Sequence, residues 1–276
     1  MRAITALTSK LFRIYPQLIK REASLAFAIE ALCEGGKLSL TSLGRAATSK
    51  TTVKHNIKRI DRLLGNPQLA QEVPKFCGAL IKTVITPSSS PLFLVDWTLI
   101  DKTHCALFAS VPYEGRAITV YFEVHPMSKL ANRAVEYAFL DTLNELLPSG
   151  VKPTLITDAG YLHPWFKKVI QLDWYFIGRL NPRMRVFTQA GQSTSVKQLE
   201  RFAKRTPTDM GACTVTITNP LSYRVIQGKR IKRNPKRRPE PRFFSGPRRG
   251  SRQAARRAFT PWVLATNHMT LSAEEI

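Results

Sequence analysis

Residues 91–101, Pro91-Leu-Phe-Leu-Val-Asp-Trp-Thr-Leu-Ile-Asp101, place an aspartate inside a continuous apolar run. The run favours a strand buried on both faces, where an ionised carboxylate is costly unless a cation or hydrogen-bond donors satisfy it. A second run, Pro153-Thr-Leu-Ile-Thr-Asp-Ala-Gly160, ends in the same way. Asp96 and Asp158 therefore suggest two oxygen ligands for a hard divalent ion. A satisfied core acid and a helix cap, respectively, would explain the same two residues.

The overall charge points to a polyanionic partner. The 276 residues carry 42 Lys and Arg against 19 acids, a formal net charge of +23, and are 43% hydrophobic, enough for one large domain or two ordinary ones. Nucleic acid is the first candidate, although ribosomal or membrane-surface binding would tolerate such a charge. No apolar run is long enough to span a bilayer and no signal core begins the chain, so we expect a soluble intracellular protein without a membrane partner. The four scattered cysteines indicate neither a zinc site nor disulfides.

The N-terminal 85 residues predict a helical DNA-binding domain. Helical spacing covers residues 8–34, then a short helix within 38–47 precedes a longer one whose apolar stripe is Val53, Ile57, Ile60 and Leu64. This outline is that of a helix-turn-helix, whose second helix lies in the major groove. A solvated basic face on an ordinary bundle is the alternative. The basic candidates for DNA contact are Lys50, Lys54, His55, Lys58, Arg59 and Arg62.

Beyond this region the pattern changes to alternating strands and helices. Residues 66–75 read as a Pro-containing connector, 76–84 as a helix and 86–90 as a linker at a domain boundary. Strands over 104–111 and 117–124 are joined by a hairpin turn, a helix covers 129–147, and a helix from Pro164 to Gln171 precedes a strand over 174–180. This order predicts a mixed sheet with helices on its faces.

Residues 183–267 predict a small β-rich insertion. Short segments at 184–187, 213–218 and 223–226 precede a basic tract over 229–257, and a last strand covers 259–267. The tract holds 13 Lys or Arg and one acid, Glu240, so we expect a loop that orders on a phosphate backbone. Its candidate DNA contacts are Lys229, Arg230, Lys232, Arg233, Lys236, Arg237 and Arg238.

The element order, with Leu94-Val-Asp-Trp97 and Thr157-Asp-Ala-Gly-Tyr161, resembles the RNase H-like catalytic core of DDE transposases. The chain is most similar to the insertion-sequence-four family of bacterial cut-and-paste transposases, and the likeness covers nearly all of it. It extends through Lys54-His-Asn-Ile-Lys-Arg-Ile-Asp-Arg-Leu-Leu-Gly65, Ala109-Ser-Val111, Gly178-Arg179 and Pro261-Trp-Val-Leu-Ala-Thr-Asn267.

The resemblance implies a fold and a chemistry. The fold is an α/β, RNase H-like mixed sheet with flanking helices, divided into a helical DNA-binding domain (1–85), a linker (86–90), a catalytic core (91–182), the insertion (183–267) and a C-terminus (268–276). Asp96 and Asp158 become the first and second catalytic carboxylates, Asp96 bridging two Mg²⁺ or Mn²⁺ ions and Asp158 holding one. The partners are double-stranded terminal inverted repeats and target DNA, and the location is the cytoplasm of a bacterium, on the nucleoid.

In this family a third carboxylate comes from a glutamate in a helical motif with a tyrosine, an arginine and a lysine, downstream of the last strand. Glu274 and Glu275 come too early and lack those companions, so we assign no third catalytic carboxylate in this chain. The expectation is a truncated, inactive transposase without the region through which intact members form homodimers on DNA. The alternatives are a DNA-binding regulator that inhibits an intact transposase and, less favoured, a generic RNase H-like nuclease.

Other residues receive roles from the resemblance or from their context. Trp262 resembles a tryptophan that stacks on a flipped base, although a core tryptophan suits a strand equally well. Arg179, after the last core strand, is a candidate phosphate contact. Tyr161 is expected to pack beside the site, and His104 and His163 are not expected to be ligands.

Overall fold

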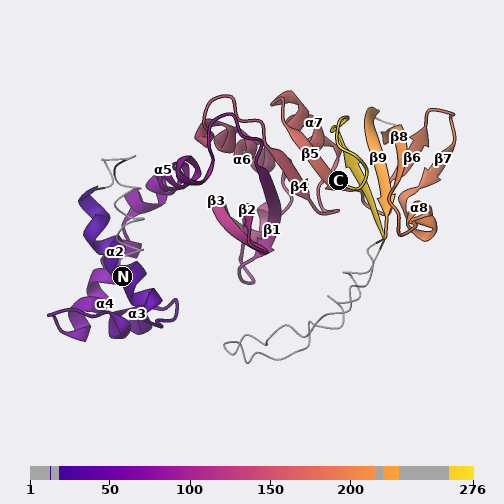
Figure 1. The fold of residues 1–276 in the computed structure, drawn as a ribbon. Coiled ribbons are helices and arrows are strands. Elements are labelled where there is room, and N and C mark those ends of the chain that lie inside the picture. The colour runs from indigo at the N-terminus through magenta and orange to yellow at the C-terminus, as the bar shows by residue number, and fades with distance from the viewer. Residues whose placement is uncertain (1–12, 14–18, 216–219, 230–260) are drawn as a thin grey trace.

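A computed structural model describes residues 13, 19–215, 220–229 and 261–276 (Figure 1). Predictions for residues 8–18, for the end of the segment 213–218 and for the basic tract after Lys229 therefore lie wholly or partly outside the described residues. The described helices are α2 (Ile19–Cys33), α3 (Leu40–Ala46), α4 (Val53–Leu64), α5 (Pro67–Val84), the 3-10 helix η2 (Met127–Lys129), α6 (Arg133–Leu146), α7 (His163–Gln171) and α8 (Val196–Phe202). The described strands are β1 (Leu92–Leu99), β2 (His104–Tyr113), β3 (Arg116–Pro126), β4 (Thr154–Thr157), β5 (Tyr175–Arg179), β6 (Arg185–Thr188), β7 (Ser193–Ser195), β8 (Thr208–Val215), β9 (Leu221–Gly228) and β10 (Trp262–Thr266).

The first half of the sheet follows the predicted order. Strands β1, β2 and β3 form an antiparallel meander, and β4 and β5 add to β1 in parallel, in the order β3-β2-β1-β4-β5. Glu114 and Gly115, both with positive φ (46° and 76°), close the β2–β3 hairpin as predicted, since such turns match the twist of the strands. This mixed sheet with flanking helices is compatible with an RNase H-like fold.

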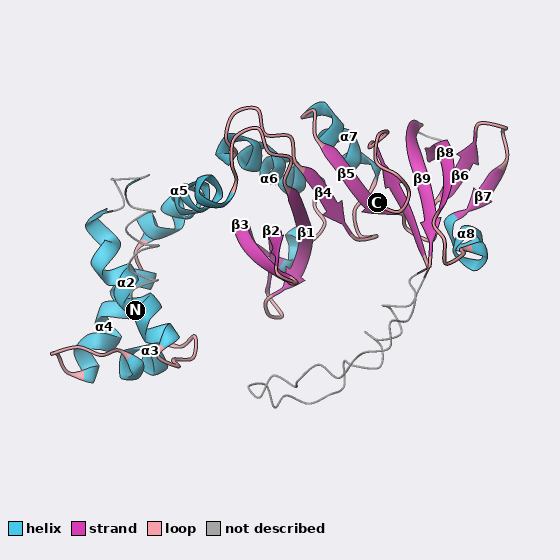
Figure 2. Cartoon of the chain, viewed as in Figure 1, coloured by secondary structure: helices cyan, strands magenta, loops and turns pink. Residues whose placement is uncertain are grey.

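The second half of the sheet continues the first without a break. Strand β10 pairs with β5 on one side, Ala265 opposite Gly178, and with β9 on the other, so that one ten-stranded sheet runs from β3 to β7 (Figure 2). The strands of the predicted insertion thus extend the core sheet. The sequence prediction omitted α8, which begins with a capping box between Ser195 and Gln198, a local signal for a helix start.

The helices α5 to α8 all pack on one face of the sheet. Phe93 and Val95 of β1, Leu155 of β4 and Phe176 of β5 belong to one core cluster with the apolar residues of these helices. The side chain of Asp96 points to the other face and is exposed. Burial of β1 on both faces was therefore a wrong prediction: β1 alternates between a covered and an accessible face, and Asp96 is not a core acid.

Helix α5 corrects the predicted connector over 66–75. Asn66 caps its start by accepting a hydrogen bond from the Gln68 N–H at 3.0 Å, and Pro67 occupies the first position, where a missing N–H costs nothing. The helix then continues through Pro74 and places Cys77 and Ile81 in the core of the sheet. Helix α5 therefore packs with the α/β core, while the domain boundary over 86–90 stays a prediction.

Helices α3 and α4 have the short-helix, turn, longer-helix outline that the sequence predicts. Their backbones approach closely, because a Cβ on Gly44 of α3 would lie 2.8 Å from the Ile57 nitrogen. The buried Asn56 locks the turn between them: its Oδ1 accepts from Ser49 and Thr51, each at 2.8 Å, and its Nδ2 donates to the Ala47 carbonyl.

The apolar stripe of α4 differs in part from the prediction. Ile60 is buried as predicted, but Val53 and Leu64 are exposed, and Asn56 and Leu63 are buried in their place. Helix α3 packs against α4 at Ile57, and this contact determines which residues of α4 are buried. Within the described part of the chain, no helix is both long and apolar enough to cross a bilayer.

Candidate active site

Asp96 and Asp158 are brought together by the parallel pairing of β1 and β4. Val95 lies opposite Thr157 in this pairing, so each aspartate is the next residue at the carboxyl end of that register. Both line a groove of about 450 Å³ on the accessible face of the sheet, together with Arg179 and Trp262. Two carboxylates from different strands that face one groove form the oxygen-rich arrangement that a hard divalent cation prefers.

The two carboxylates repel each other. Partial burial raises the pKa of Asp96 above its usual value, and the negative charge of Asp158 raises this pKa further. A hydrogen bond from the backbone N–H of Trp97 lowers it. A like charge nearby destabilises the ionised state of Asp96. A bound cation would relieve this repulsion.

The loop after β4 fixes the position of Asp158. The N–H of Gly160 donates to its Oδ1 at 2.8 Å, and the Asn181 side chain donates to the Ala159 carbonyl at 3.4 Å. Helix α7 begins only at His163, with Leu162 as its N-cap and no side-chain cap. Asp158 therefore does not cap the following helix, and its carboxylate remains available to the groove.

Gly160→Ala tests this placement. A Cβ at position 160 would lie 2.9 Å from Asp158 Oδ1, so the carboxylate has to turn away from its present position. We expect a small change in the free energy of unfolding, below about 1 kcal/mol because only the end of a side chain moves, but a loss of about tenfold in Mn²⁺ affinity. Calorimetric titration of both proteins with Mn²⁺ measures this, and equal affinities would show that the position of Asp158 does not matter to the site.

Arg179 lines the same groove as the two aspartates. One guanidinium nitrogen donates to Glu200 Oε1 of α8 at 3.2 Å and to the Pro261 carbonyl at 3.4 Å. Its Nε is buried and has no hydrogen-bond partner among the described residues. The guanidinium thus carries positive charge beside the carboxylates.

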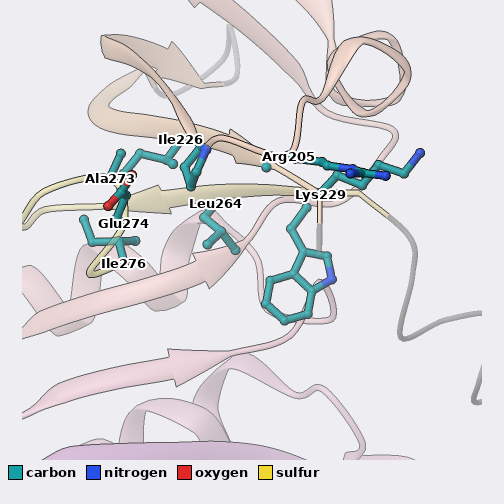
Figure 3. Close-up of a pocket in the computed structure, with 10 residues that line it drawn as sticks. Arg205, Ile226, Lys229, Leu264, Ala273, Glu274 and Ile276 are labelled. Atoms are coloured by element: carbon teal, nitrogen blue, oxygen red, sulfur yellow. The ribbon is translucent and has the colours of Figure 1, made fainter. Parts of the chain in front are cut away.

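Trp262 lies on β10 where two grooves meet. It is 41% exposed, so it is not the core tryptophan of the alternative interpretation. The second groove, of about 460 Å³, shares Trp262, Leu264 and Ile276 with the first. Figure 3 shows Arg205 and Lys229 at one end of the second groove and Ala273 and Glu274 at the other. The shared residues make the two grooves adjacent parts of one surface.

No third carboxylate joins Asp96 and Asp158 within the described residues, where no group of three His, Cys, Asp or Glu side chains could hold a metal ion. Glu275 accepts hydrogen bonds from the Ser272 N–H and hydroxyl, both at 2.8 Å, and Glu274 lines the second groove. That neither acid is catalytic stays a prediction.

The other residues considered in the sequence make local contacts. Tyr161 is buried and its ring lies 4.7 Å from that of Trp165, as expected for a residue packed beside the site. His163 is buried, with its Nδ1 3.0 Å from the Tyr223 hydroxyl, and burial lowers its pKa. The exposed His104 bonds to Thr103 and Asp101.

The predicted DNA contacts on α4 and in the turn before it are for the most part accessible. Lys50, Lys54, His55, Lys58 and Arg62 are exposed. Arg59 instead ties α4 to α2: its guanidinium donates to the Ala23 carbonyl at 2.7 Å and lies 4.3 Å from the centre of the Phe27 ring. Lys229 is exposed at the end of β9, whereas the other predicted contacts of the basic tract, Arg230, Lys232, Arg233, Lys236, Arg237 and Arg238, lie outside the described residues.

Three charged residues were missed by sequence reasoning: Glu200 and Arg205 beside the grooves, and Glu136 on the covered face of the sheet behind Asp96. Glu200 and Arg205 come from segments far from either aspartate in the sequence, and only the pairing of β10 with β5 and β9 brings them near the site. Glu136 had a weak signal, since it is an acid on the otherwise apolar face of a helix.

These features define a class: an α/β protein whose mixed sheet presents two aspartates in a groove suited to a divalent cation. Residues 88–276 match the family model of the transposase DDE domain, and the chain belongs to this family. It is thus a transposase by family, and the substrate of such enzymes is DNA. Comparison with curated proteins and with solved structures found no match.

Proposed function

We propose that this chain belongs to a transposase of a bacterial insertion sequence, of the insertion-sequence-four type, that cuts and joins DNA at terminal inverted repeats. The observation that supports this most is the adjacent placement of Asp96 and Asp158 in one groove of a chain that matches the DDE domain. Asp96 and Asp158 would both serve as ligands of the metal. When bound, Mg²⁺ or Mn²⁺ activates the attacking oxygen and stabilises the leaving oxygen of the scissile phosphate.

The surroundings of the pair suit a DNA strand. Arg179 lies in the same groove, and the positive charge of its guanidinium suits a backbone phosphate. Trp262 presents an exposed ring on which a base can stack. Lys54, Lys58 and Arg62 on α4 would contact the duplex outside the cleavage site, and the homodimer on paired ends and the location on the bacterial nucleoid are parts of the same proposal.

A second function is a non-catalytic DNA-binding regulator that inhibits an intact transposase. The observation that favours it is the lack of a third carboxylate near the pair among the described residues, because two carboxylates hold two cations less firmly than three. In that case the chain would inhibit the intact transposase by binding DNA through the basic surface of α4.

Cleavage of a labelled duplex that carries the element's terminal repeats separates these functions. An active transposase produces cuts in Mg²⁺ or Mn²⁺ that fall at least about a thousandfold in Asp96→Ala, since that change removes a metal ligand. Salt-sensitive binding without such cuts would identify the regulator. Cleavage that survives in Asp96→Ala would contradict the assignment of Asp96.

A further inference from the structure

Helix α6 contacts the segment that carries Asp96. The indole N–H of Trp97, the residue after Asp96, donates to Glu136 Oε1 at 3.1 Å. The same indole is flanked by His125, with the ring centroids 5.9 Å apart, and His125 is held by Glu123 at 2.8 Å. The Trp97 indole is thus held in position by Glu136 and His125. Because Asp96 is the preceding residue of the same strand, these contacts also restrict the orientation of its side chain.

Helix α6 also contacts the segment that follows Asp158. Tyr137, the next residue after Glu136, donates from its hydroxyl to the Pro164 carbonyl at 3.2 Å. Lys168 of α7 forms an ion pair with Asp141 of α6, which holds the two helices together further along. Two consecutive residues of one helix therefore contact Trp97, next to Asp96, and Pro164, at the start of the helix that follows Asp158.

Ordinary packing does not account for the carboxylate at position 136. Glu136 is only 8% exposed, and burying a carboxylate is costly, whereas a leucine would fill the same space without that cost. The polar group therefore serves the hydrogen bond to Trp97 rather than the core.

We propose that Glu136 is a positioning residue, which sets the direction of Asp96 through Trp97 so that the two aspartates can share a cation. Tyr137 has the same role for the Asp158 segment through Pro164. This inference rests on the proposed function, because it assumes a cation at Asp96 and Asp158. It predicts that α6 determines metal affinity without contributing a ligand.

Binding of Mn²⁺ to the purified chain, measured by electron paramagnetic resonance, tests this inference without requiring activity. Glu136→Ala should weaken Asp96-dependent Mn²⁺ binding about tenfold, the usual effect of removing a partner behind a metal ligand. Glu136→Gln keeps an acceptor oxygen for Trp97 and should stay within about twofold of the wild type. Tyr137→Phe should weaken binding in the same direction as Glu136→Ala.

Leu140→Ala is the matched control. Leu140 is a fully buried residue of α6, so this change destabilises the protein through the core without touching either hydrogen bond. It should lower the melting temperature and leave the Mn²⁺ affinity of the folded protein unchanged.

The outcomes separate this inference from the proposed function. Normal Mn²⁺ affinity in Glu136→Ala, or an equal loss in Glu136→Gln or in Leu140→Ala, would overturn the role of Glu136 while leaving the metal site in place. If the wild type binds no Mn²⁺ that Asp96→Ala removes, the metal site itself is wrong and the inference fails with it.

Discussion

Replacing Asp96 by asparagine is expected to raise the melting temperature of the metal-free protein and to abolish its stabilisation by Mn²⁺. The first effect follows mainly from the partial burial of the Asp96 carboxylate and further from the repulsion by Asp158, since both costs disappear with the charge of Asp96. The second follows from the loss of a ligand: the wild type gains about 2.7 kcal/mol at a Mn²⁺ concentration one hundred times its Kd, and the variant gains none. Thermal unfolding with and without Mn²⁺ measures both.

The pH dependence of this effect has a definite sign. Because the pKa of Asp96 is higher in the folded than in the unfolded state, its contribution to stability is present when the group is protonated and is lost as the pH rises through the raised pKa. The advantage of Asp96→Asn over the wild type should therefore grow with pH and then level off above that pKa.

Asp101→Asn is the control for this experiment. Asp101 is an exposed acid in the turn after β1, and hydrogen bonds from Thr103 and His104 lower its pKa to about 2. Its contribution is present above the unfolded pKa and is lost as the pH falls, so its removal should lower the melting temperature and leave the Mn²⁺ response intact. A Mn²⁺ response in Asp96→Asn equal to that of the wild type would contradict the metal site.

Removing three cations from α4 is expected to weaken DNA binding severely and to change its salt dependence. In the variant with Lys54, Lys58 and Arg62 replaced by alanine, the slope of log K against log salt should fall by about 2.7, which is 0.9 for each lost phosphate contact. All three side chains are exposed, so the fold should not change. Fluorescence anisotropy with a terminal-repeat duplex at several salt concentrations measures the slope.

A charge-matched variant shows whether the position of these cations matters. Replacing Lys75, Arg116 and Lys152 by alanine removes the same charge from exposed positions on other elements. The α4 variant should lose far more affinity than this control. Equal losses would mean that total charge alone accounts for binding and that α4 is an ordinary solvated basic face.

Much of the core was predictable because its signals are local. The apolar runs that end on Asp96 and Asp158 gave β1 and β4, and the parallel pairing expected of such strands placed the two acids side by side. The hairpin between β2 and β3 was likewise predictable from its two turn residues, Glu114 and Gly115. Each of these features depends on fewer than a dozen neighbouring residues.

The features that could not be predicted depend on contacts between distant segments. The pairing of β10 with β5 joins residues about ninety positions apart, and together with the pairing of β10 with β9 it turns the predicted insertion into an extension of the core sheet. The packing of α5 to α8 on one face leaves Asp96 exposed, although the composition of β1 suggests burial on both sides. The role of Glu136 could not be predicted either, because it depends on a hydrogen bond with Trp97 of β1, which is distant in the sequence.

The most direct test of the central claim is the anomalous scattering of Mn²⁺ in crystals of the protein. We expect an anomalous-difference peak between the carboxylates of Asp96 and Asp158 that is lost in Asp96→Asn. Mn²⁺ bound elsewhere, with these two carboxylates bare at saturating Mn²⁺, would show that the pair is not a metal site and that the proposed chemistry is wrong.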